Sequence, residues 1–144
     1  MAMIRTVSGS ISAEEMGKVL IHEHFVFGYP GSLGDSVSPY DRRRAVEAGI
    51  RVAEQVKKFG VKTIVDATPN DCGRDPEVLR EIAEKTGLNI VCATGYYYEG
   101  EGAPHYFRFR KALGSDLREE IYELFMKEIT VGIGDTGIKA GVIK

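Results

Sequence analysis

Apolar residues recur three and four positions apart in three stretches of this chain, which is the spacing of one face of an α-helix. The clearest stripe lies within residues 45–59 and comprises Ala45, Ala48, Val52, Val56 and Phe59. The same periodicity predicts helices over residues 76–86 and 117–129. Shorter apolar and β-branched runs predict buried strands: Lys18–His24, Lys62–Ala67, Leu88–Thr94 and Ile138–Lys144.

Residues that begin and end helices support these boundaries. Asp75 can accept the free N–H groups of a first helical turn, and Pro76 suits the first helical position. Gly60, Gly87 and Gly132 follow the three predicted helices, and glycine at this place commonly ends a helix. A loop rich in tyrosine and glycine is expected from Gly95 to about Pro104.

The alternation of strands and helices predicts an α/β fold with a parallel sheet and right-handed crossovers. Two architectures satisfy this order, an open doubly wound sheet and part of a (β/α)8 TIM barrel. A complete barrel needs about 250 residues, and this chain has 144. In the barrel interpretation, residues 1–144 supply the N-terminal half of one domain, roughly four strands and three helices. Its first and fourth strands are then open edges, which can pair with other chains.

His22-Glu23-His24 closes the first predicted strand. Because side chains alternate along a strand, the two imidazoles project to the same side. Barrels of this kind place their catalytic groups at the C-terminal ends of their strands, and imidazole nitrogen binds zinc, iron, nickel or cobalt. Two histidines do not complete a zinc site, which takes three or four ligands. From spacing alone, a structural or surface role stays open.

Lys144 ends the fourth predicted strand at the same rim. Burial of a lysine is costly unless its charge is lost or paired, and desolvation in general leaves lysine as a neutral, nucleophilic amine. Such an amine can form a Schiff base, or take up carbon dioxide to become a carbamate that bridges two cations. The alternative is a solvated lysine on a frayed strand.

Polar residues follow the second and third predicted strands. Tyr96, Tyr97 and Tyr98 come directly after the third strand. A phenol can donate a hydrogen bond to a metal-bound water or a substrate oxygen, whereas at least one of the three is expected to pack under the loop. Asp66, at the end of the second strand, is either a loop cap or an acceptor beside the site. Arg74 can pair with a carboxylate.

Two further patterns predict no cofactor or disulfide chemistry. Gly132–Gly137 matches G-x-G-x-x-G, but it follows a helix and opens a strand, the reverse of a dinucleotide-binding turn. We interpret it as a helix stop and turn. Cys72 and Cys92 are too few for a disulfide framework and are predicted to be reduced thiols near the core.

The composition predicts a globular chain, with 43% hydrophobic residues, 28% charged residues and a net charge of −2. There is no basic excess that would favour nucleic acid or a membrane surface. The apolar runs are far shorter than the roughly 20 residues that span a bilayer, and the first residues lack signal or transit character. We expect a cytoplasmic protein that binds neither nucleic acid nor membranes.

Several segments, taken in order, resemble the opening of the phosphotriesterase-like lactonases of the amidohydrolase superfamily. They are residues 6–9, 16–24, 65–71, 89–95 and 135–144, which include His22-Glu23-His24 and the terminal Gly-Val-Ile-Lys. The resemblance extends over essentially the whole chain. It implies a (β/α)8 barrel with a binuclear metal centre, of which this chain is the N-terminal half.

The resemblance also implies roles for individual residues. In that family two strand-1 histidines bind the more buried metal, and they carry over to His22 and His24. A carboxylated strand-4 lysine bridges both metals and carries over to Lys144. A tyrosine after strand 3 contacts the bridging hydroxide or the substrate oxygen; Tyr97 is the best match for this catalytic role, with Tyr98 next to it as a substrate contact. The remaining ligands, two histidines and an aspartate from strands 5, 6 and 8, are not in this chain.

The implied activity is opening of γ- or δ-lactones or N-acyl-homoserine lactones by a metal-bridging hydroxide, with promiscuous phosphotriester hydrolysis. The implied cofactors are two divalent cations, zinc first and then cobalt, iron or manganese, and the implied assembly is a homodimer. The 144-residue chain alone is expected to be inactive. A phosphotriesterase or carboxylesterase is a weaker third possibility. From another class, the alternative is a non-catalytic half-barrel that serves folding or assembly.

Overall fold

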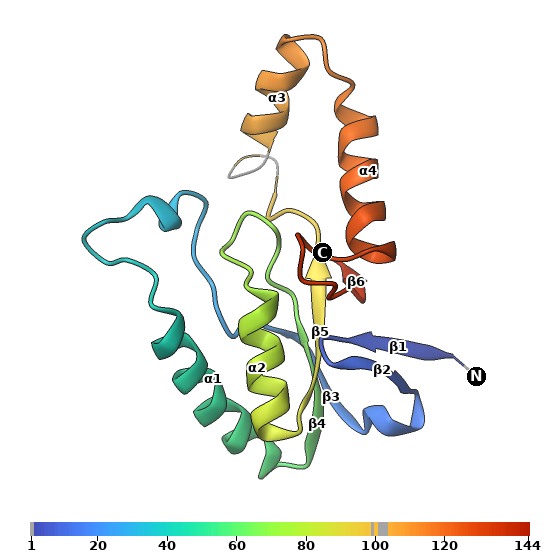
Figure 1. The fold of residues 1–144 in the computed structure, drawn as a ribbon. Helices are drawn as coiled ribbons and strands as arrows, with labels where there is room; N and C mark the ends of the chain where they lie inside the picture. The colour runs from blue at the N-terminus through green and yellow to red at the C-terminus, as the bar shows by residue number, and fades with distance from the viewer. Residues whose placement is uncertain (1, 99, 101–103) are drawn as a thin grey trace.

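The computed structural model describes residues 2–98, 100 and 104–144. Its centre is a parallel sheet in the order β3-β4-β5-β6. The strands are β3 (Lys18–Glu23), β4 (Val61–Asp66), β5 (Asn89–Thr94) and β6 (Val142–Ile143). The α-helices of the described residues are α1 (Arg42–Lys57), α2 (Pro76–Thr86), α3 (Pro104–Ala112) and α4 (Leu117–Thr130). Figure 1 shows α1 and α2 together on one side of the sheet, and α3 and α4 as an arm beyond the end of β5.

The three predicted helices are confirmed, but α3 is an additional helix that the apolar spacing does not predict. Part of the predicted loop from Gly95 to Pro104, namely positions 99 and 101–103, lies outside the described residues. The α3–α4 pair occupies the place between β5 and β6 where one helix was expected. The turn over Gly132–Gly137 joins α4 to the segment before β6, as expected for a helix stop.

The predicted strand Ile138–Lys144 is wrong in its first half, because only its end pairs with β5. The N–H of Ile133 donates to the carbonyl of Ile138 at 2.8 Å, which closes the turn after α4. The N–H of Ala140 donates to the carbonyl of Glu128 at 3.0 Å instead of to a neighbouring strand. These bonds to α4 and its turn leave a strand of two residues.

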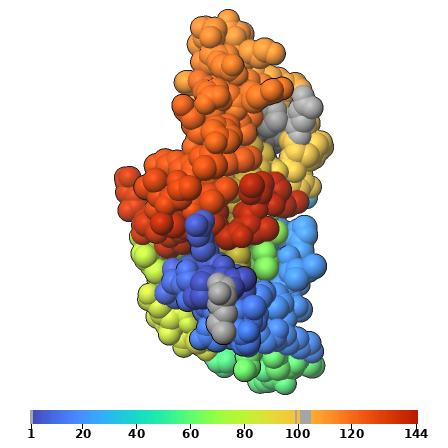
Figure 2. Space-filling model, turned by 90° about the vertical axis from the view of Figure 1, so that its right-hand side faces the viewer, coloured from blue at the N-terminus to red at the C-terminus, as the bar shows by residue number. Residues whose placement is uncertain are grey.

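An antiparallel hairpin of β1 (Met3–Thr6) and β2 (Gly9–Ser12) precedes the sheet. The N–H of Val7 donates to the carbonyl of Ile90 at 2.8 Å, which ties the hairpin to β5. Figure 2 shows the hairpin in blue directly below the C-terminal segment in red. Two 3₁₀ turns, η1 (Glu14–Met16) and η2 (Ser32–Gly34), lie on either side of β3.

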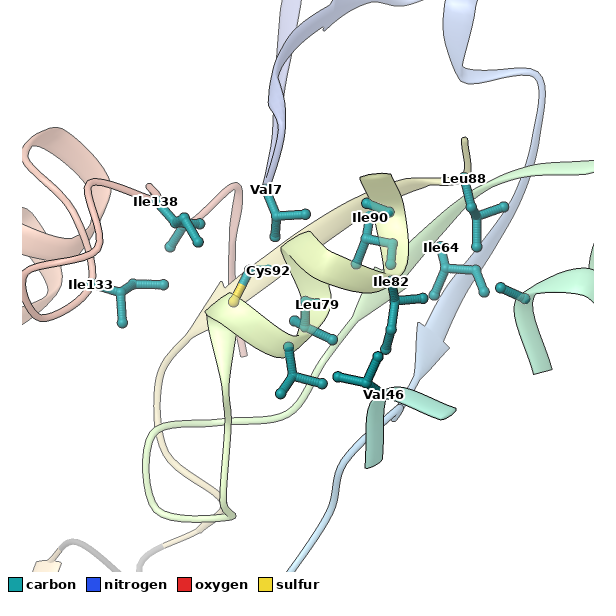
Figure 3. Packing of buried hydrophobic residues seen from close by; sticks show 14 of the residues in the cluster. Val7, Val46, Ile64, Leu79, Ile82, Leu88, Ile90, Cys92, Ile133 and Ile138 are labelled. Atoms are coloured by element: carbon teal, nitrogen blue, oxygen red, sulfur yellow. The ribbon is translucent and has the colours of Figure 1, made fainter. Parts of the chain in front are cut away.

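The hydrophobic core lies between the sheet and the inner faces of α1 and α2 (Figure 3). Ile64 of β4 and Ile90 of β5 are buried against Leu79 and Ile82 of α2. Burying one such side chain contributes about 1.5–3 kcal/mol. The core continues under the turn after α4 through Val7, Ile133 and Ile138. It therefore joins the hairpin, the sheet and the C-terminal segment.

The predicted start and end of the second helix are confirmed by its capping geometry. The Asp75 carboxylate accepts the N–H of Val78 at 3.0 Å, and Pro76 occupies the first turn. Gly87 ends the helix with φ of +69°, a left-handed conformation that favours glycine. Cys72 and Cys92 are both free and buried, as predicted.

None of the helices in the described part of the chain has the length and apolar character needed to cross a bilayer.

Candidate metal centre

The two strand-end histidines lie side by side. His22 belongs to β3, and His24 follows the last residue of that strand. Their ring centroids are 5.3 Å apart in an edge-to-face arrangement. The predicted projection of both rings to one side is therefore confirmed, and Glu23 lies between them in the chain.

Both rings line a cavity of about 230 Å³ at the carboxyl ends of the strands. The lining residues are His22, His24, Phe27, Pro69, Tyr97 and Lys144. They come from β3 and its following loop, from the loops after β4 and β5, and from the residue after β6. The cavity thus joins segments from both ends of the chain, and it contains every residue predicted as a metal ligand.

Lys144 is placed by its backbone. Its N–H donates to the carbonyl of Thr94 at 2.7 Å, which continues the pairing of β6 with β5. A side chain at Gly95 could not be accommodated, because an added Cβ would lie 2.4 Å from the Lys144 carbonyl oxygen. Lys144 itself is exposed. The reason is its position after an edge strand that no described residue covers on its outer side.

The environment favours the neutral form of His24. Partial withdrawal from water lowers the pKa of its ring, and the nearby charges of His22 and Lys144 act in the same direction. The Asp66 carboxylate opposes them and is the largest single charge effect. A neutral imidazole keeps a nitrogen lone pair, which is the form that binds a metal ion.

The three tyrosines after β5 point in different directions. Tyr97 lines the cavity, and Tyr98 packs edge-on against it with ring centroids 5.1 Å apart. Tyr98 is 53% exposed and is not part of the cavity lining. Tyr96 turns toward the arm and contacts Phe107 and Phe125, and burial raises its pKa to about 12. Tyr96 is the packing residue expected among the three.

Asp66 is a loop cap, one of the two roles that its position suggested. Its carboxylate accepts the N–H of Phe25 at 2.8 Å and the N–H of Thr68 at 3.0 Å. Burial raises the pKa of this carboxyl, and the two backbone hydrogen bonds act against that rise. Asp66 therefore holds together the loops after β3 and β4, which carry His24 and Pro69.

Arg74 pairs with a carboxylate, and its partner is Glu128 of α4. The two side chains form a bidentate pair with both distances 2.8 Å, and they are 7% and 6% exposed. Arg74 also donates to the carbonyl of Ala93, and Thr94 donates its hydroxyl proton to Glu128 at 2.5 Å. The sequence does not predict this role of Glu128, because Glu128 resembles the other polar residues of the helix 117–129. Sequence reasoning also missed Phe27, Pro69 and Thr68, which carry no signal of their own beyond lying after strand ends.

The donor set fits one side of a divalent metal centre. Two imidazoles and a primary amine converge on a common cavity, and imidazole nitrogen suits zinc and its neighbours. Residues 2–98, 100 and 104–144 contain no cluster of three His, Cys, Asp or Glu side chains that could hold a metal ion.

Comparison with known proteins decides the family. The sequence model described as the phosphotriesterase family matches residues 2–144. The chain belongs to the phosphotriesterase family. The resemblance found in the sequence is thereby confirmed, and so is the choice of a barrel over an open sheet, because the solved structures of the family extend the same arrangement.

Three relatives illustrate how close this phosphotriesterase-family chain is to known proteins. The organophosphorus hydrolase of Deinococcus radiodurans is 52% identical with a TM-score of 0.93, over 98% of this chain and 42% of that chain. A mutant PTE-like lactonase from the same organism is 50% identical with a TM-score of 0.92, over 97% and 44%. The phosphotriesterase homology protein of Mycobacterium tuberculosis is 37% identical over 100% of this chain and 44% of its own length. The chain thus spans less than half the length of these relatives.

Proposed function

We propose that this chain forms part of a binuclear metal-dependent hydrolase that opens lactones and cleaves organophosphate triesters as a second activity. The observation that supports the proposal most strongly is the convergence of His22, His24, Tyr97 and Lys144 on one cavity. The names of two similar structures, an organophosphorus hydrolase and a PTE-like lactonase, agree with both substrate classes.

His22 and His24 are proposed to hold one of two divalent cations, zinc by preference. The amine of Lys144 would take up carbon dioxide and release one proton, which forms an N–C bond and leaves an anionic carbamate. Its two oxygens suit contact with two cations at once.

Bound divalent cations would lower the pKa of water and polarise the ester carbonyl, which supplies both nucleophile and electrophile at neutral pH. Tyr97 is proposed to donate its phenolic proton in a hydrogen bond to the carbonyl oxygen that becomes negative during attack. Phe27 and Pro69 add apolar surface to the same cavity and exclude water around the ester. Tyr98 would contact the part of the substrate that extends beyond Tyr97.

The test uses the full-length protein, with γ- and δ-lactones, N-acyl-homoserine lactones and a phosphotriester as substrates. We expect lactone opening that is abolished by a chelator and restored by zinc or cobalt. Activity toward the phosphotriester is expected to be lower. If no lactone is opened in a chelator-sensitive manner, the substrate assignment is wrong.

Matched variants separate the proposed roles. Tyr97→Phe is expected to lower kcat about 10- to 100-fold, because a hydrogen bond to developing charge is worth about 1.5–3 kcal/mol. Tyr96→Phe removes the same hydroxyl one residue away, outside the cavity, and should leave kcat within about twofold. Lys144→Met should lose bound zinc, whereas Lys144→Glu, which supplies a carboxylate, should retain part of it. Equal zinc content in both Lys144 variants would contradict the carbamate.

We further propose that the protein is a homodimer. The arm of α3 and α4 exposes several large apolar side chains, among them Tyr106, Phe109 and Tyr122, and exposed apolar patches commonly mark contacts between chains. Sedimentation of the full-length protein tests this. The alternative is a half-barrel that assembles without catalysis. It would be supported by a stable assembly that binds no metal.

A further inference from the structure

One ring nitrogen of His24 forms a hydrogen bond within the protein. Its Nδ1 lies 2.9 Å from the hydroxyl oxygen of Thr68. Thr68 follows β4 and is 1% exposed, so this hydrogen bond is sheltered from water on the side of Thr68. Which of the two atoms supplies the proton follows from the other bond of the same hydroxyl.

The hydroxyl of Thr68 has a single proton, and a second acceptor is in reach of it. Its Oγ1 donates to the carbonyl oxygen of Val26 at 3.1 Å. A carbonyl can only accept, and the Asp66 carboxylate is a further acceptor of this hydroxyl, so with its proton in either bond a lone pair of Thr68 faces His24. The Nδ1 of His24 must then carry hydrogen and donate it. In a neutral imidazole this leaves Nε2 with the free lone pair.

Asp66 keeps Thr68 and His24 in this arrangement. One of its oxygens accepts the N–H of Thr68 at 3.0 Å, and the other accepts the N–H of Phe25, the residue after His24, at 2.8 Å. The carboxylate is 1% exposed. Both partners of the His24–Thr68 bond are therefore tied to the same buried group, which limits the freedom of either to move away.

His22 provides an internal contrast. Within the described residues, no hydrogen bond is found to the ring of His22, and its neighbour His24 contacts it only edge-on. The described contacts fix the tautomer of one cavity histidine and not that of the other.

We propose that Thr68 is a positioning residue that holds His24 in its Nδ1–H tautomer and so leaves the Nε2 lone pair for the cavity that His24 lines. The tautomer stands on the hydrogen bonds alone, and its consequence for metal binding rests on the proposed function. Partners of this kind tune metal affinity about 10- to 100-fold in metalloproteins.

The first measurement is the tautomer itself, in the metal-free full-length protein, by nitrogen–proton correlation NMR of the imidazole rings at a pH where they are neutral. A His24→Gln variant identifies the signals of His24, because these are the ones that it lacks. We expect Nδ1–H for His24 in the wild type and in Thr68→Ser, which keeps the hydroxyl. Thr68→Val, which has the same shape without it, should show a mixture of tautomers. A wild-type His24 with hydrogen on Nε2 overturns the proposal even if no variant folds.

The second measurement is zinc affinity by competition with a chromophoric chelator. Thr68→Val should bind zinc about 10- to 100-fold more weakly than the wild type, and Thr68→Ser within about threefold. A shifted tautomer with unchanged zinc affinity would overturn the metal-positioning role. If wild-type protein binds no zinc while His24 shows the expected tautomer, the proposed function fails and the hydrogen-bond assignment stands.

Discussion

The buried pair of Arg74 and Glu128 lends itself to a quantitative test. Arg74→Met replaces the guanidinium by an apolar side chain of similar length. It removes both hydrogen bonds to Glu128 and the bond to the carbonyl of Ala93. The carboxylate of Glu128 then keeps Thr94 as a donor but loses its opposite charge.

The expected cost follows from the burial of both side chains, which are 7% and 6% exposed. Breaking a buried pair on one side leaves an uncompensated charge and costs about 3–5 kcal/mol, whereas replacing both partners by apolar residues is often close to neutral. Arg74→Met should therefore lower the free energy of unfolding by about 3–5 kcal/mol. The double variant Arg74→Met/Glu128→Leu should lose less than Arg74→Met alone.

The assay is urea unfolding of the metal-free protein at pH 7, repeated under acid conditions. Arg74 and Thr94 hold the pKa of the Glu128 carboxyl below its ordinary value, although burial acts in the opposite direction. The wild-type pair therefore stabilises the fold above the ordinary carboxyl pKa of 4.5 and loses this contribution as the pH falls through the folded value. In Arg74→Met burial without the opposing cation favours the protonated carboxyl, so the difference between variant and wild type should begin to shrink above pH 4.5 and should shrink further below it, where the wild type loses its own contribution.

An exposed pair of similar geometry serves as the control. Arg110 and Glu120 are also bidentate, at 2.7 and 2.6 Å, but their side chains are 42% and 22% exposed. Arg110→Met should cost less than about 1 kcal/mol. The reasoning is refuted if Arg74→Met costs no more than Arg110→Met, or if the double variant loses the sum of its two single losses.

Three other outcomes follow from the structure. Gly95→Ala brings a Cβ within 2.4 Å of Lys144 at φ of +127° and should weaken both stability and zinc binding. Gly9→Ala, at φ of +129° with open space around it, should show only the backbone cost of about 1–3 kcal/mol. Urea unfolding and zinc titration of both variants check this. Burial raises the pKa of Cys92 from 9.0 to about 12. The buried neutral thiol therefore contributes fully to stability below pH 9, and this contribution is lost as the pH rises toward 12. In thermal unfolding, Cys92→Ala should reduce this alkaline loss of stability. Asp75→Ala removes the cap of α2 and should cost about 1 kcal/mol by chemical unfolding, with Asp75→Asn close to wild type.

The elements with local signals could be predicted from the sequence. The helices α1, α2 and α4 have periodic apolar faces, and α2 has its capping residues in place. The predicted length of β6 was too great because Ile138 and Ala140 are apolar for another reason. Both residues pack in the core, and their backbones form hydrogen bonds with the end of α4 and the turn after it. No local rule distinguishes that use of an apolar run from a strand. The β1–β2 hairpin had a weak signal in Gly9, which sits at the turn with φ of +129°.

The residues of the candidate site also fall into those that the local sequence predicts and those that it does not. Strand-end position and alternation were enough to place His22 and His24 together and Lys144 beside them. The supporting residues Thr68 and Glu128 could not be predicted, because each acts through a partner 44 or 54 positions away in the chain. The local sequence does not predict contacts between residues so far apart in the chain.

The cavity spans the sheet from its first parallel strand to its last. The histidines come from β3 and the lysine from the end of β6, with β4 and β5 between them. A ligand bound from both sides would link β3 to the end of β6 and would oppose an increase in the separation of these two strands. By linkage, a ligand that binds only the curved form of the sheet stabilises that form. The curvature of the sheet and the occupancy of the cavity are therefore thermodynamically coupled.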